Sequence, residues 1–198
     1  MGCRQNHQIG TIMSSYKTTL GIIINKRDIG DNDLLITLLT PTYGKIVSLA
    51  KGAHKINSRR LGHLQLGNIV KANFFEKNNR LWLSETTNIS AFLLSQKNLV
   101  QLNLLFLFLE FINQLLPENQ HTPEAYTICK NIISAIKDNK FKTYIYNEIK
   151  LIKILGFGVP EDILKSYKAE NYVLTQNLLK SFFESIIERP IESNKLFT

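Results

Sequence analysis

The sequence predicts an α+β protein, in which a five-stranded OB-fold β-barrel is followed by an α-helical bundle. Two observations support this fold class. Residues 18–88 contain five short runs rich in β-branched and leucine side chains, with one longer connection between the third run and the fourth. Residues 88–198 instead repeat apolar side chains at spacings of three and four, as amphipathic helices do. We expect an OB-fold domain at residues 14–90 and a helical domain at 91–198.

The five expected strands are bounded by residues that favour turns. The strands are expected at residues 18–26, 34–40, 45–51, 68–76 and 81–87. An Asp- and Gly-rich turn separates the first two, Pro41 and Gly44 shape the next, and residues 77–80 suit a hairpin. Side chains of a strand alternate between its faces, so Ile46, Ser48 and Ala50 share one face, and the neighbours Phe74 and Phe75 cannot both point inwards.

Four longer segments are expected to be helical. They comprise residues 92–116, a segment that starts at Thr122-Pro123 with the threonine hydroxyl as N-cap, residues 141–155 and residues 175–187. The first is apolar on more than one face, which is typical of a helix at the centre of a bundle. Gly156 is a natural stop for the third.

Composition excludes several classes of protein. With 198 residues, of which 44% are hydrophobic and 20% charged, the chain resembles a soluble globular protein rather than a disordered or collagen-like one. The most apolar stretch, residues 99–116, is interrupted by five polar residues and is expected to be a buried helix, so no membrane-spanning segment is expected. Two cysteines, Cys3 and Cys129, are too few for a disulfide framework or a four-ligand zinc site and suit a reducing cytoplasm. Residues 1–13 are interpreted as a leader or an expression remnant.

The positive charge is concentrated in the N-terminal half. Of the net charge of +8, residues 1–90 carry 12 basic against 5 acidic side chains, or +7, and the rest carry 12 against 11, or +1. Residues 45–80 hold eight of the cations and a single acid, Glu76. Such a concentration indicates a polyanionic partner, either nucleic acid or an anionic membrane surface.

The basic interval is the strongest candidate site. Lys51, Lys55, Arg59 and Arg60 cluster in one connection, with Lys45 and Lys71 on neighbouring strands. Barrels of this type bind single strands with a cationic groove and aromatic platforms, for which Tyr43, Phe74, Phe75 and Trp82 are candidates. The alternative is a solvated basic surface with the aromatic side chains in the core.

No motif for catalysis, a metal or a cofactor is found. Asp28, Asp31 and Asp33 lack the spacing of a calcium loop and are explained as turn residues. The segment 156–158 begins like a dinucleotide fingerprint but follows a helix and lacks the third glycine. None of the histidines is spaced from a nucleophile or another metal-binding residue as a catalytic or metal site would require. We therefore expect a protein that is not an enzyme and needs no cofactor.

Several motifs, taken in order, resemble those of one family. They are KTTLGIII at 17–24, GDNDLL at 30–35, LLTPTYGK at 38–45, LAKGAH at 49–54, SRRL at 58–61, LQ at 64–65, ILGFG at 154–158 and RPIESNKLF at 189–197. The sequence thus resembles the bacterial DNA repair protein RecO family from about residue 16 to its C-terminus. The order of the TPxYGK and AKGA motifs is the most specific part of this resemblance.

The resemblance implies a recombination mediator in the bacterial cytoplasm, associated with the nucleoid. Such a protein would bind single- and double-stranded DNA, anneal complementary strands and, with RecR, help RecA replace single-stranded DNA-binding protein (SSB). His54 stands where an arginine is common in the family and joins the candidate DNA contacts. The cysteines that bind zinc in some members are absent, so the resemblance implies a helical domain without a zinc finger.

The resemblance also implies that the acidic C-terminal tail of SSB docks on the protein. In this chain, which is short for the family, Lys130, Lys137, Lys150 and Lys153 are the candidate rim charges of a pocket in the helical domain. An RNA-binding OB-fold module remains the alternative function, because charge and aromatic content do not separate DNA from RNA. A nucleic-acid-cleaving enzyme would need a carboxylate or metal cluster, and none is found.

Overall fold

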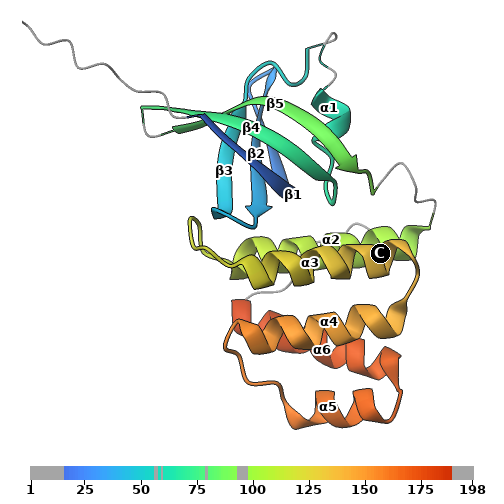
Figure 1. Cartoon of the computed structure of the whole chain (residues 1–198). Coiled ribbons are helices and arrows are strands. Elements are labelled where there is room, and N and C mark those ends of the chain that lie inside the picture. Colours follow the sequence, from blue (N-terminus) through green and yellow to red (C-terminus); the bar gives the residue numbers. More distant parts are fainter. Residues whose placement is uncertain (1–15, 56–57, 59, 79, 93–97, 189–198) are drawn as a thin grey trace, which may run out of the picture.

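The N-terminal half forms a closed β-barrel and the C-terminal half a stack of helices, which confirms the expected fold class (Figure 1). The computed structural model describes residues 16–55, 58, 60–78, 80–92 and 98–188. The expected leader and Arg59 lie outside these residues. No helix among the described residues is long and apolar enough to cross a bilayer.

The barrel has the strand order β1-β2-β3-β5-β4. Its elements are β1 (Tyr16–Ile29), β2 (Asp33–Thr40), β3 (Gly44–Ala50), α1 (Arg60–His63), β4 (Ile69–Lys77) and β5 (Arg80–Ser90). All strand pairs are antiparallel except β3 with β5, which closes the barrel. The long β1 pairs with both β2 and β4 and has an irregularity between Ile23 and Asn25, which lets one strand serve two edges.

Side chains alternate between the interior of the barrel and its outer face, as predicted. Ile46, Ser48 and Ala50 are buried together on β3. Phe74 is in the interior, whereas Phe75 is on the outer face and only partly buried. The short helix α1, which the sequence pattern did not predict, brings Leu61 and Leu64 against the interior cluster and so covers one end of the barrel.

Within the described part of the chain, five helices follow the barrel and lie in layers below it (Figure 1). They are α2 (Leu99–Leu115), α3 (Pro123–Lys137), α4 (Phe141–Ile154), α5 (Glu161–Lys168) and α6 (Tyr172–Ile187). The layer of α2 and α3 faces the barrel, α4 and α6 lie beneath, and α5 is farthest from the barrel. Gly156, at φ +84°, follows the end of α4 as predicted.

Two predictions about the helices were wrong in detail. The hydroxyl of Thr122 does not cap α3, because its backbone has φ −140° and ψ 68° and the side chain makes no capping hydrogen bond. Helix α5 was not predicted. It has only eight residues, and its apolar stripe is too short to stand out from the flanking turns.

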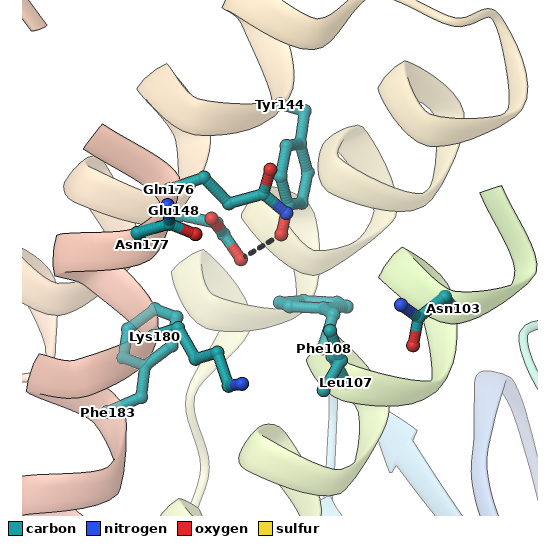
Figure 2. Close-up of a pocket in the computed structure, with 9 residues that line it drawn as sticks. All are labelled: Asn103, Leu107, Phe108, Tyr144, Glu148, Gln176, Asn177, Lys180 and Phe183. Carbon is teal, nitrogen blue, oxygen red and sulfur yellow. Dashed lines mark hydrogen bonds between the residues drawn. The ribbon is translucent and has the colours of Figure 1, made fainter. Parts of the chain in front are cut away.

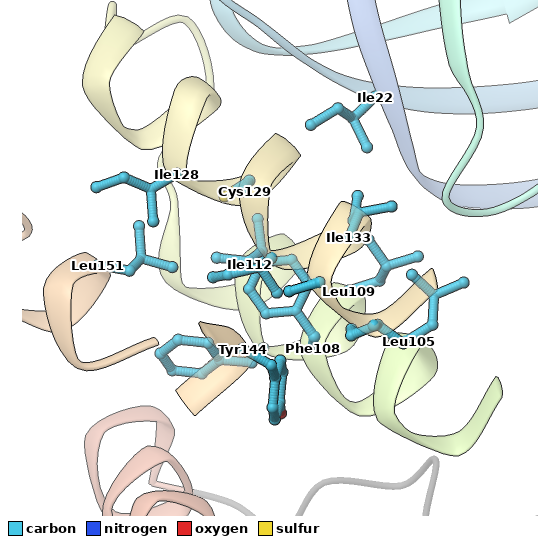
Figure 3. Close-up of a cluster of buried hydrophobic side chains, with 14 of the residues drawn as sticks. Ile22, Leu105, Phe108, Leu109, Ile112, Ile128, Cys129, Ile133, Tyr144 and Leu151 are labelled. Carbon is cyan, nitrogen blue, oxygen red and sulfur yellow. The ribbon is translucent and has the colours of Figure 1, made fainter. Parts of the chain in front are cut away.

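The outer face of the barrel contributes to the core of the helical half. Ile22, Ile24 and Leu39 lie in the same hydrophobic cluster as the buried faces of α2 and α3, whereas Ile23, between the two isoleucines, points into the barrel. Figure 3 shows Ile22 approaching this layer from the barrel side, opposite Leu109 and Ile133. Because successive side chains of β1 point to opposite faces, this one strand contributes to both hydrophobic cores.

Backbone contacts fix the junction between barrel and helices. Lys45 forms an isolated parallel bridge with Glu118 in the α2–α3 loop, and the backbone N–H of Asn119 donates to the Lys45 carbonyl at 2.8 Å. Gly44 has φ +66°, and a Cβ atom on it would lie 1.8 Å from the carbonyl oxygen of Gln120. Only glycine permits this approach. The TPxYGK motif thus ends in the residues that hold the two halves together.

Candidate nucleic-acid interface

The cationic loop after β3 is fastened to the turn between β1 and β2. The backbone N–H of Gly52 donates to the Asp33 carboxylate at 2.7 Å, and that of His54 donates to the Asn32 carbonyl at 3.0 Å. His54 Nε2 also lies 2.8 Å from Asp28 Oδ1. The acidic turn therefore positions the loop, which is a structural use of the aspartates.

The loop holds three of the predicted DNA contacts on exposed side chains. Lys51, His54 and Lys55 are all exposed. The loop lies at the end of the barrel remote from the helices (Figure 1). A cationic patch at this position can meet a polyanion without interference from the helical half.

Arg60 has a different environment from these lysines. Its guanidinium donates to the carbonyl oxygens of Leu83 and Ser84 on β5 and to that of Lys51. It is partly buried and connects α1, β5 and the end of β3. These bonds use donors of the guanidinium to hold the end of the barrel in place, which gives Arg60 a structural role there.

Lys45 lies at the junction between the barrel and the helices, away from the cationic loop. It is 8% exposed, and its ammonium donates to the Asn113 carbonyl of α2 at 2.7 Å. Burial lowers the pKa of Lys45, and the nearby carboxylate of Glu118 opposes this effect in part. The sequence placed Lys45 correctly on β3, but the approach of the α2–α3 loop, distant in sequence, covers it. Lys45 is a junction residue.

An aromatic row crosses the outer face of the barrel on β1, β4 and β5. Tyr16 is paired with Phe75, and Phe75 with Trp82. The Phe75 and Trp82 rings are 6.1 Å apart at an interplanar angle of 9°, and the Tyr16 and Phe75 rings are 6.3 Å apart. Tyr16 is 77% exposed. Trp82 was predicted, whereas Tyr16 was missed, because its place beside Phe75 depends on the register between β1 and β4.

A groove with a volume of about 630 Å³ adjoins this row. It has an apolar floor from β2 and β3 and a mixed charged rim, with the lining residues Lys17, Ile29, Leu35, Val47, Leu49, Glu76, Arg80, Leu81, Glu118 and Asn119. Leu49 pairs with Trp82 across the β3–β5 seam and lies two residues before Lys51. The aromatic row, the groove and the cationic loop thus meet at Leu49.

The remaining barrel candidates are divided between these surfaces. Lys71 is exposed on the outer face of β4, opposite Leu20 and Thr87. Tyr43 is partly buried against the barrel interior, and the ammonium of Lys17 lies 5.5 Å from its ring centroid. Tyr43 lies in the turn between β2 and β3, next to Gly44 at the junction with the helices.

The four lysines predicted as rim charges do not form one cluster. Lys130 and Lys137 line a groove of about 270 Å³ between the barrel and α3, with an apolar floor that includes Ile69, Phe92 and Ile133. Lys137 also donates to the Ala91 carbonyl at 3.3 Å. Lys150 and Lys153 are exposed on α4 and do not line this groove.

No group of three or more His, Cys, Asp or Glu side chains that could hold a metal ion is found within the described part of the chain. The carboxylates nearest the basic loop, Asp28 and Asp33, already bind His54 and the backbone of Gly52. What the surface offers is cations, stacked rings and an apolar floor.

Comparison with known proteins identifies the barrel. Residues 13–92 match the family model described as "Recombination protein O N terminal", a span that covers every strand of the barrel. The barrel is therefore similar to the N-terminal domain of the RecO family. The resemblance found from the sequence motifs is thereby confirmed.

Curated relatives extend this similarity beyond the barrel. The DNA repair protein RecO of Thermoanaerobacter sp. (strain X514) is 28% identical over 142 residues, which cover 70% of this chain and 57% of that protein. The protein of the same name from Syntrophobacter fumaroxidans is 29% identical over 122 residues, 62% of this chain and 49% of the relative. The DNA repair protein RecO of Leptospira biflexa is 25% identical over 195 residues, which cover 92% of this chain and 78% of that protein. The chain thus spans about half to three fifths of the length of the first two.

Proposed function

We propose that this chain is a member of the RecO family that binds DNA through its barrel and acts in DNA repair and recombination. The observation that carries the proposal is the convergence at Leu49 of the aromatic row, the apolar groove and the loop of Lys51, His54 and Lys55. Sequence-tolerant binding of single strands combines such stacking platforms with a cationic track. The names of the relatives support repair as the process.

The proposed mechanism needs no bond-making residue. Lysines of the loop would neutralise phosphates of one strand and release condensed counterions, while bases of that strand stack on Phe75 and Trp82. Lys71 would make a further phosphate contact for a second strand or for duplex DNA. Contacts of this kind hold the backbone weakly and leave base edges exposed, which permits annealing of complementary strands.

The proposed partners are those that the resemblance to the RecO family implies. We propose cooperation with RecR in loading RecA onto SSB-coated DNA, in the cytoplasm and at the nucleoid. For the acidic tail of SSB, the groove between the barrel and α3 is the preferred site, because Lys130 lies at its edge over an apolar floor. This combination suits a peptide with both acidic and apolar side chains.

The first experiment measures single-strand affinity across a salt series. We expect the double substitution Lys51→Glu and Lys55→Glu to weaken binding and to reduce the slope of log K against log salt by about 1.4, since each lost contact removes about 0.7. The matched control is Lys165→Glu with Lys168→Glu on α5, the helix farthest from the barrel (Figure 1). An equal effect of both pairs would mean that only net charge matters, and the proposed site would be wrong.

The aromatic row has its own test. Replacing Trp82 with alanine is expected to cost about 1–3 kcal/mol of single-strand affinity, the range for a stacked base. Competition between DNA and RNA of the same sequence then decides between the proposal and an RNA-binding module. Preferential retention of RNA would favour the module.

SSB docking is tested by titrating a fluorescent peptide with the SSB tail sequence. We expect Lys130→Glu to abolish binding, while the control Lys153→Glu, on the exposed face of α4, leaves it intact. Equal loss in both variants would show nonspecific attraction and would remove the groove from the proposal.

A further inference from the structure

A polar cleft lies within the helical half, on a surface that the proposed DNA contacts do not use. It is bounded by α2, α4 and α6 and has a volume of about 200 Å³. Two aromatic rings, a carboxyl, a phenol, three carboxamides and an ammonium line it, contributed by Phe108, Phe183, Glu148, Tyr144, Asn103, Gln176, Asn177 and Lys180 (Figure 2). Such a density of polar groups is unusual between packed helices.

Only some of these polar groups have a hydrogen-bond partner within the cleft. The Tyr144 hydroxyl donates to Glu148 at 2.6 Å, and both side chains are nearly fully buried. The Asn103 Oδ1 atom is buried and accepts no hydrogen bond from the described residues. A buried polar atom without a partner costs free energy, and a ligand that donates to it removes that cost.

The cleft also has a flat apolar wall. Phe108 is 2% exposed, and its ring forms the floor beneath Tyr144 and Glu148, while Lys180 approaches from α6 (Figure 2). The volume of the cleft is below the roughly 300–1,000 Å³ of sites for drug-sized ligands, so the occupant is one small unit rather than a stretch of strand.

We propose that this cleft binds a single nucleobase with its attached phosphate. Carboxamides offer donors and acceptors together, which matches the mixed edge of a base, and a lysine ammonium is a common phosphate partner. The ligand is either a free nucleotide or one unstacked base of a bound strand. The choice of a nucleotide among planar ligands rests on the proposed DNA-binding function.

The buried carboxyl supports this chemistry. Burial raises the pKa of Glu148 to about 8, so at neutral pH the group is mostly protonated and can donate a hydrogen bond to a ring nitrogen. The hydroxyl of Tyr144 holds the carboxyl in place. Lys180 is the one cation among the residues that line the cleft, and it would hold the phosphate.

The test uses isothermal titration of the full chain with dAMP, dCMP, dGMP and dTMP, and with ribose 5-phosphate as a probe without a base. We expect saturable binding of at least one nucleotide and at least tenfold weaker binding of ribose 5-phosphate. Asn103→Leu and Lys180→Met should each weaken nucleotide binding at least tenfold, whereas Lys168→Met on α5 should not. If Asn103→Leu does not fold, Lys180→Met provides the test, because Lys180 is partly exposed.

Three results would overturn the inference: no saturable nucleotide binding, equal binding of ribose 5-phosphate, or unchanged affinity in both variants. The Lys51→Glu and Lys55→Glu protein should still bind nucleotides, which separates failure of this site from failure of the barrel site. A 2-aminopurine oligonucleotide distinguishes the ligand sources. Displacement of its fluorescent base by the nucleotide indicates a strand base, and no displacement indicates a free nucleotide.

Discussion

The barrel and the helical half both bury polar side chains, but they differ in the chemistry of these groups. The barrel half buries the uncharged Thr40, Ser48 and Asn68, and it buries Lys45 at the junction with the helices. The helical half buries Gln101, Asn147, Glu148, Ser166 and Thr175, each with a hydrogen-bond partner. Glu148 is the one acid among the buried side chains of the described residues, and it lies in the helical half. We therefore expect the stability of the barrel to be insensitive to pH and that of the bundle to depend on it.

The largest expected effect comes from breaking the contact between the two halves. Gly44→Ala places a Cβ 1.8 Å from the Gln120 carbonyl at φ +66°, so we expect a loss of about 3 kcal/mol or more in the free energy of unfolding. The matched control is Gly30→Ala, at φ +57° with no atom within 4 Å of the new Cβ. This variant should lose only about 1–2 kcal/mol, which is the cost of the left-handed backbone conformation for a residue with a Cβ atom. Urea unfolding measures both, and equal losses would mean that the junction tolerates the methyl group.

The second effect concerns the buried carboxyl of the helical half. Because burial raises the pKa of Glu148 from 4.5 to about 8, the folded state retains a proton that the unfolded chain releases. The protonated Glu148 carboxyl therefore makes its full contribution to the free energy of unfolding below pH 4.5. This contribution is lost as the pH rises to about 8. Between pH 5 and 8 the loss is on the order of 3 kcal/mol.

Glu148→Gln removes this dependence, since the amide does not titrate. Urea unfolding at pH 5, 6.5 and 8 should give a falling free energy for the unaltered protein and a flatter series for the variant. Glu124→Gln, at the exposed start of α3, is the control and should keep the slope. A variant with the full pH dependence would show that another group is responsible.

A third, smaller effect separates a structural cation from a binding cation within the barrel. Arg60→Met leaves three carbonyl groups without their donor and is expected to cost about 1–3 kcal/mol of stability. Lys51→Met should leave stability within about 0.5 kcal/mol and reduce the salt slope of single-strand binding by about 0.7. The reverse assignment of these two effects would contradict the division proposed between the two residues.

The smallest effect is expected at Lys71. Lys71→Gln removes one exposed charge from the outer face of β4, so we expect unchanged stability and a salt slope for duplex DNA lower by about 0.9. Polarization titrations with duplex and single strands provide the measurement. No change with either substrate would remove Lys71 from the interface.

The local parts of this structure could be predicted from the sequence, and the long-range parts could not. The strands, and the expectation that Phe74 and Phe75 do not both point inwards, follow from alternation along the chain. The burial of Lys45 and the row that Tyr16 begins depend on contacts 68 and 59 residues away in the chain, at Asn113 and Phe75. A count of charges makes Arg60 a candidate binding cation, but it does not show that the guanidinium donates to the carbonyl oxygens of Leu83 and Ser84.

The position of the sole tryptophan makes it a built-in optical reporter. Trp82 stacks on Phe75 at the β3–β5 seam, on the outer face of the barrel. Its fluorescence follows the barrel alone, whereas far-ultraviolet circular dichroism is dominated by the helices. Recording both signals in one titration would tell whether the halves come apart separately or in one step, with no label attached.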